Sequence, residues 1–167
     1  MQVRNVHERE FTRPLATVGA LIDSLASRDD RLWPLGKWPP MRFDRPLAVG
    51  AAGGHGPVRY SVEEYHPGQS IVFRFSAPRG FDGTHRFEVE DWQGTTVLRH
   101  VIEMCATGPA LLSWPLIFRP LHDACLEDCL DQATISLGIQ LERPARWPAY
   151  VRLLRAVMRT IAPSKQS

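Results

Sequence analysis

Two long segments of alternating polarity, residues 84–92 and 95–106, constrain the fold of this chain more than any other feature. In each segment apolar side chains occupy every second position, which is the pattern of a strand with one buried face. Gln93 and Gly94 separate the segments and predict a two-residue turn, and hence an antiparallel hairpin. A slip by one residue would break both the apolar and the charged pairings, so the register is well determined. The predicted pairs are Val89 with Leu98, Phe87 with His100, His85 with Ile102 and, on the other face, Glu88 with Arg99.

A long amphipathic helix is predicted over residues 120–137, where apolar side chains repeat at helical spacing. His122 lies near the middle of the apolar stripe, while His85 and His100 lie on the apolar face of the hairpin. Three histidines are therefore expected to face the interior. Titratable side chains at three interior positions predict a functional site there. The stripe comprises Cys125, Leu126, Cys129, Leu130, Ala133 and Leu137, and the acidic residues Asp123, Glu127, Asp128 and Asp131 lie away from it.

The remaining elements are predicted from local patterns and form a second hairpin and flanking helices. In the second hairpin, a Pro67-Gly68 turn would set Val62 opposite Phe73 and Tyr60 opposite Phe75. Prolines are expected to bend the helical region before residue 120. The other predicted elements are a strand over 2–11, a helix over 14–26, a short strand over 42–49, the second hairpin over 58–75, and a helical segment over 110–118 with Pro115 and Pro120 at the bend.

Two loops carry unusual compositions. Residues 27–41 contain Trp-Pro pairs, a context that favours extended backbone, and form either a packed loop over one end of the sheet or a lid over a pocket mouth. Residues 50–57 are rich in glycine but lack the Lys-Ser/Thr of a phosphate loop, so nucleotide binding is rejected. We expect a flexible connection there, with His55 exposed or at a cavity entrance.

Composition excludes several classes of protein. The length of 167 residues fits one domain with a substantial core, and 20 basic against 18 acidic residues give no electrostatic case for nucleic-acid binding. No apolar run approaches the roughly 18 residues of a membrane span, and the polar start resembles no signal peptide. The three cysteines include two placed one helical turn apart, a poor geometry for a disulfide. We therefore expect a cytoplasmic protein without disulfides.

The order of these elements resembles the helix-grip fold of the START-like (SRPBCC) superfamily, which includes pollen allergens, START domains and polyketide cyclases/dehydrases. The resemblance rests on the strands PGQSIVFRF, GTHRFEVE and TVLRHVIEM and on the helix PLHDACLEDCLDQA. It implies an α+β domain over residues 1–142, in which a curved antiparallel sheet wraps around a long C-terminal helix and leaves a cavity. Six strands are predicted where the family usually has seven. Residues 143–167 form a linker and an amphipathic helix outside the resemblance.

We expect this fold to bind a small hydrophobic or amphipathic molecule, such as a lipid, an aromatic compound or a polyketide, between sheet and helix. Two alternatives stay open: a polyketide cyclase/dehydrase-type enzyme and a protein-interaction or chaperone-like module. No catalytic motif is shared across the superfamily, so the candidate acid–base residues are the interior histidines His85, His100 and His122. The predicted ligand-binding residues are Tyr60, Val62, Phe73, Phe75, His85, Phe87, Leu98, His100, Ile102, Met104, Trp114 and His122.

No metal and no cofactor are predicted. His122, Cys125 and Cys129 share a helix face but span two turns, which is wide for one ion, and cysteine also serves as a small core residue. The helix at residues 149–162 could touch an anionic membrane surface, but we expect it to pack on the domain or a second subunit of a homodimer. Its predicted apolar stripe is Tyr150, Leu154, Val157 and Ile161, with Arg152, Arg155 and Arg159 opposite.

Overall fold

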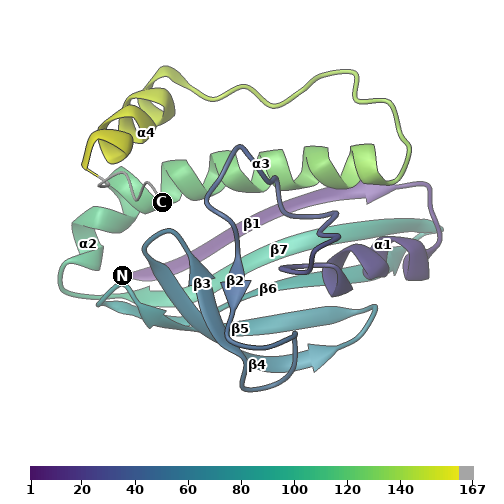
Figure 1. Ribbon diagram of the computed structural model, residues 1–167, viewed down its shortest axis with the longest axis horizontal. Helices are drawn as coiled ribbons and strands as arrows, with labels where there is room; N and C mark the ends of the chain where they lie inside the picture. Colours follow the sequence, from purple (N-terminus) through teal and green to yellow (C-terminus); the bar gives the residue numbers. More distant parts are fainter. Residues whose placement is uncertain (162–167) are drawn as a thin grey trace.

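The computed structural model describes residues 1–161, the last three by their backbone alone. Within this range one antiparallel seven-stranded sheet, in the order β1-β7-β6-β5-β4-β3-β2, curves beneath a long helix (Figure 1). The elements in chain order are β1 (Gln2–Phe11), α1 (Leu15–Asp23), β2 (Arg42–Phe43), β3 (Ala52–His55), β4 (Val58–His66), β5 (Ser70–Ala77), β6 (Phe81–Trp92), β7 (Thr95–Ala106), α2 (Ala110–Ser113), the π-helical η1 (Trp114–Phe118), α3 (Arg119–Ser136) and α4 (Ala149–Ile161).

Both predicted hairpins form in the predicted register. Strands β6 and β7 pair Phe87 with His100 and Glu88 with Arg99, and the latter two side chains form an ion pair with an N–O distance of 3.4 Å. Strands β4 and β5 pair Val62 with Phe73 as expected. The alternation of side chains therefore sets which face of the sheet is buried.

The prediction for residues 42–57 was wrong. The strand expected over 42–49 ends at Phe43, and the glycine-rich stretch expected to be a flexible connection forms β3. Glycine is required there because a Cβ atom on Gly53 would lie 2.0 Å from the backbone oxygen of Arg42, and one on Gly54 equally close to that of Val58. This extra strand raises the count from six to seven.

The region from Ala110 to Ser136 is one helical run with an irregular middle. Its backbone widens into π-helix over Trp114–Phe118. This segment contains Pro115 and precedes Pro120, and both prolines lack the N–H group that a regular α-helix needs. Figure 1 shows α2 inclined away from the axis of α3, as the prolines predicted. The apolar stripe of α3 packs on the sheet, with Cys129 and Ala133 fully buried.

Helix α4 lies on the side of α3 away from the sheet (Figure 1). The predicted stripe was wrong in part: Val151 and Leu154 pack against α3, whereas Tyr150 and Val157 are exposed. The apolar side chains of α4 cover one wide arc of the helix, and only the part that carries Val151 and Leu154 meets α3. The side chains of Arg159 and Ile161 and all of residue 162 lie outside the described residues. No described helix is long and apolar enough to cross a membrane.

Candidate functional site

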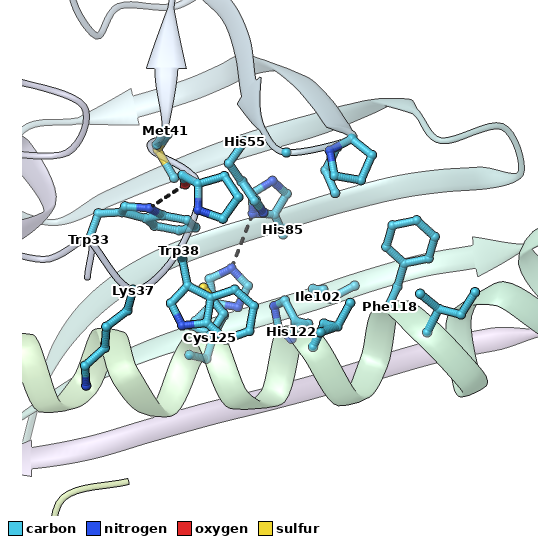
Figure 2. Close-up of a pocket in the computed structure, with 18 of the residues that line it drawn as sticks. Trp33, Lys37, Trp38, Met41, His55, His85, Ile102, Phe118, His122 and Cys125 are labelled. Atoms are coloured by element: carbon cyan, nitrogen blue, oxygen red, sulfur yellow. Dashed lines mark hydrogen bonds between the residues drawn. The ribbon is translucent and has the colours of Figure 1, made fainter. Parts of the chain in front are cut away.

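A cavity of about 700 Å³ lies between the sheet, α3 and the Trp-Pro loop at residues 33–41 (Figure 2). The sheet contributes side chains from β5, β6 and β7, and the turn between β3 and β4 closes one side. Helix α4 reaches the same space through Arg155 and Met158. The cavity thus draws its walls from segments spread over most of the described chain.

The structure divides the predicted binding residues into two groups. Those that line the cavity are Phe75, His85, Phe87, His100, Ile102, Trp114 and His122. Tyr60, Val62, Phe73, Leu98 and Met104 are buried in the core beside it and outside its lining. Sequence reasoning missed Met41, Phe81, Phe118 and Leu121. The lid interpretation of residues 27–41 pointed to Trp33 and Trp38, which also line the cavity.

His85 and His100 form a buried pair on neighbouring strands. Their side chains are in contact through His85 Nδ1 and His100 Nε2, 3.3 Å apart, so one ring donates to the other (Figure 2). Burial lowers the pKa of both histidines well below the ordinary value, and the neighbouring histidines lower it further. Both rings are therefore neutral, and the second nitrogen of each has no partner among the described residues.

His122 extends this cluster from the helix side. Its ring lies 5.0 Å from that of His100, and neither of its nitrogens has a hydrogen-bond partner in the described chain. Burial lowers the pKa of His122 against the opposing effect of the Asp123 carboxylate. The wall of the cavity thus holds neutral imidazoles with unused hydrogen-bonding capacity.

His55 also lines the cavity, at the turn between β3 and β4. Its Nδ1 lies 2.9 Å from the Tyr60 hydroxyl, and its ring packs on Trp33 at 4.7 Å. Burial lowers the pKa of His55 to about 3. Of the two places predicted for this residue, the structure selects the cavity.

His7 belongs to a separate polar interface between β1 and α3. Its nitrogens lie 2.9 Å from Glu127 and 3.1 Å from Asp123, while Arg9 donates to Asp131. Burial lowers the pKa of His7, but the hydrogen bonds to the two carboxylates outweigh it and raise the pKa to about 9. Sequence analysis did not group His7 with the interior histidines, and although it does not line the cavity its ring lies 5.7 Å from that of His122.

A buried carboxylate fastens the Trp-Pro loop to α3. Asp128, which is 1% exposed, accepts hydrogen bonds from Lys37 and from the indole N–H groups of Trp38 and Trp147, each at 2.7 Å. The Arg155 guanidinium lies 4.1 Å from the ring centres of both tryptophans. The loop and α4 are thereby held together over one side of the cavity.

Comparison with solved structures bears on the fold. CalU16 from Micromonospora echinospora superposes with a TM-score of 0.59 at 12% identity, covering 93% of this chain and 83% of that chain. The helix-grip arrangement of sheet and helix is therefore shared. The chain has the helix-grip fold. A second solved structure is a norcoclaurine synthase point mutant from Thalictrum flavum in complex with a transition-state analogue. It superposes with a TM-score of 0.58 at 14% identity, covering 83% of this chain and 97% of that chain.

The di-domain ARO/CYC StfQ from the steffimycin biosynthetic pathway gives a TM-score of 0.61 at 11% identity, covering 82% of this helix-grip chain and 51% of that chain. No family model and no curated protein matches the sequence. At these identities the likeness concerns the fold, and the site has to be interpreted from its own residues.

Proposed function

We propose that this protein binds a small, largely apolar molecule in the cavity between the sheet and α3. The observation that supports this proposal best is the cavity itself, whose volume of about 700 Å³ lies in the range of small-molecule sites. Its walls are mainly aromatic and aliphatic, so burial of the ligand's apolar surface would supply most of the affinity. The norcoclaurine synthase neighbour, solved with a transition-state analogue, supports the same use of the fold.

The neutral histidines would orient such a ligand. Unpaired nitrogens of His85, His100 and His122 lie buried, and a buried polar group without a partner costs about 1–3 kcal/mol. A ligand that places hydroxyl or carbonyl groups against them would recover part of this free energy. We therefore expect a molecule with an apolar body and one polar end.

A variant that fills the cavity tests the binding proposal. Leu121 is buried and lines the cavity from α3, so Leu121→Trp should occupy ligand space and weaken binding of Nile red at least about tenfold, equivalent to about 1.4 kcal/mol. Leu112→Trp is the matched control, because Leu112 is 71% exposed and does not line the cavity. Fluorescence titration gives both affinities, and native mass spectrometry of the purified protein would reveal a retained ligand.

Equal affinities for the two variants, each folded by circular dichroism, would place the dye elsewhere on the surface. The binding proposal would then lose its support. Failure of the parent protein to bind any apolar dye would have the same consequence.

The contact between His85 and His100 favours a second candidate, acid–base catalysis on the bound molecule, as in a cyclase or dehydrase. One neutral imidazole can accept a proton from a ligand while its neighbour donates one, and the 3.3 Å contact would let the shared proton move between the rings. His100→Phe should then abolish turnover of a candidate hydroxyketone but preserve dye binding. Unchanged turnover would reject the catalytic candidate and leave the binding proposal standing.

A further inference from the structure

The polar interface between β1 and α3 contains a compact group of metal-ligand side chains. It is formed by His7 on β1 and by His122 and Asp123 on α3. Nε2 of His7 lies 3.1 Å from Oδ1 of Asp123, and Nδ1 of His122 lies 3.7 Å from the same oxygen. One ligand atom from each residue lies within 4.8 Å of the other two. Bonds of about 2.0–2.1 Å to a tetrahedral ion would separate its ligands by about 3.3 Å, close to these distances.

The residues around this group are arranged as supports for metal ligands. Nδ1 of His7 lies 2.9 Å from Oε1 of Glu127, and Nδ2 of Asn5 donates to Asp123 at 2.9 Å. Metal-bound histidines usually donate their second N–H to a carboxylate, and metal-bound carboxylates are hydrogen-bonded in turn. With the His7 proton directed at Glu127, the lone pair on Nε2 faces the Asp123 oxygen. Either a proton or a metal ion would fit between this nitrogen and the Asp123 oxygen, which lie 3.1 Å apart.

His122 favours a metal ion over a proton as that cation. A second proton on His7 would satisfy His7 and Asp123, but it would leave both nitrogens of His122 buried and without a partner among the described residues. A metal ion bound to Nδ1 of His122 would contact all three residues at once. A metal ion would thus give His7, His122 and Asp123 one common partner.

We propose that His7, His122 and Asp123 bind one divalent transition-metal ion of the zinc class. Two imidazoles and one carboxylate suit zinc, cobalt and iron, and three protein ligands leave a coordination position open. Because His122 also lines the cavity, the ion would lie beside the cavity wall. The site shares His122 with the proposed ligand cavity, but metal binding can be tested without a ligand. It differs from the set His122, Cys125 and Cys129 weighed from the sequence.

Cobalt titration of the full chain, first stripped with a chelator, tests the site. We expect one equivalent of Co²⁺ to bind with a visible absorption band, and Zn²⁺ to displace it. His7→Gln, His122→Gln and Asp123→Asn should each weaken binding about 100-fold or more. Glu127→Gln, which removes only the supporting carboxylate, should weaken it about 10-fold to 100-fold. His66→Gln, at the exposed end of β4, is the matched control and should bind as the parent does.

Two outcomes would overturn the proposal. One is the absence of Co²⁺ and Zn²⁺ binding by the folded parent at concentrations of about 100 μM, which would leave a proton as the cation at His7. The other is binding that persists in all three ligand variants, which would show that the ion sits elsewhere. Because Glu127→Gln retains every ligand, it keeps the test decisive if a ligand variant fails to fold.

Discussion

His85 shows how one buried side chain can make a fold sensitive to acid. Its ring packs against Tyr60, Phe73 and Phe75 and is held neutral, since burial lowers its pKa well below 6.5. As the pH falls below about 6.5, the unfolded chain gains a proton at this position before the folded chain does. The contribution of neutral His85 to the unfolding free energy is therefore fully present above that pH. It is lost as the pH falls toward the folded-state pKa.

The variant His85→Phe should remove this contribution. In the parent, each pH unit below about 6.5 should cost up to about 1.4 kcal/mol of unfolding free energy for this one proton. Phenylalanine fits the aromatic surroundings and takes up no proton, so the variant should lose less stability over the same range. Urea unfolding at a series of pH values measures both slopes. Identical slopes would show that His85 is not the group responsible.

The sequence could place some histidines and not others. Alternation within one strand puts His85 and His100 on the apolar face, because neighbouring side chains alone determine that face. The position of His7 depends on α3, which lies 116 residues further along the chain at Asp123. Asn5, His7 and Arg9 form a polar face that meets Asp123, Glu127 and Asp131, and matching the spacing of these two sets is the signal that would have found the interface.

At the scale of elements, Asp128 joins three segments that are separate in the sequence. The Trp-Pro loop and the linker before α4 both direct hydrogen bonds to this carboxylate, which α3 carries. Two indole N–H groups converge on one of its oxygens, Oδ2. An amide there would present its own N–H groups or a weaker acceptor to these donors.

Asp128→Asn should therefore destabilise the fold by about 2–4 kcal/mol, since it leaves buried donors unsatisfied. Hydrogen exchange should increase over residues 33–41 more than in β6 and β7. Asp29→Asn is the control, because the Asp29 side chain is 91% exposed, and it should change stability by less than about 0.5 kcal/mol. Equal stability of the two variants would mean that Asp128 does not hold the loop.

Elements differed in how well local sequence specified them. The central hairpin and α3 were predictable because their apolar periodicity extends over many residues. Strands β2 and β3 were not, because Gly53 and Gly54 pair through backbone contacts that no side-chain pattern records. The rotation of α4 depends on Arg155 and its two tryptophans, a contact between distant segments.

For the whole molecule, we propose that residues 1–142 form the folding domain and residues 143–167 an appended segment. The sheet and α3 make up the helix-grip fold, and α4 packs on the outer side of α3 through Val151. The resemblance predicted this architecture from the order of elements. The cavity could not be predicted in size, because its volume depends on how all its walls pack.

A chain that stops after residue 142 should still unfold cooperatively. It loses the bond from Trp147 to Asp128 and the burial of Val151, so its unfolding free energy should fall by about 2–4 kcal/mol. Calorimetry or urea unfolding measures this difference. A shortened chain without a cooperative transition would show that the segment belongs to the domain itself.

The placement of the tryptophans has an optical consequence. Trp33, Trp38 and Trp114 line the cavity, and Trp147 lies 5.6 Å from Trp38, whereas Trp92 is 58% exposed and does not line it. Ultraviolet emission from the first four rings reports on the surroundings of the cavity. In a Trp92→Phe protein, all the indole emission would come from these four rings. A shift of the emission wavelength would then report that the cavity is filled, without any added label.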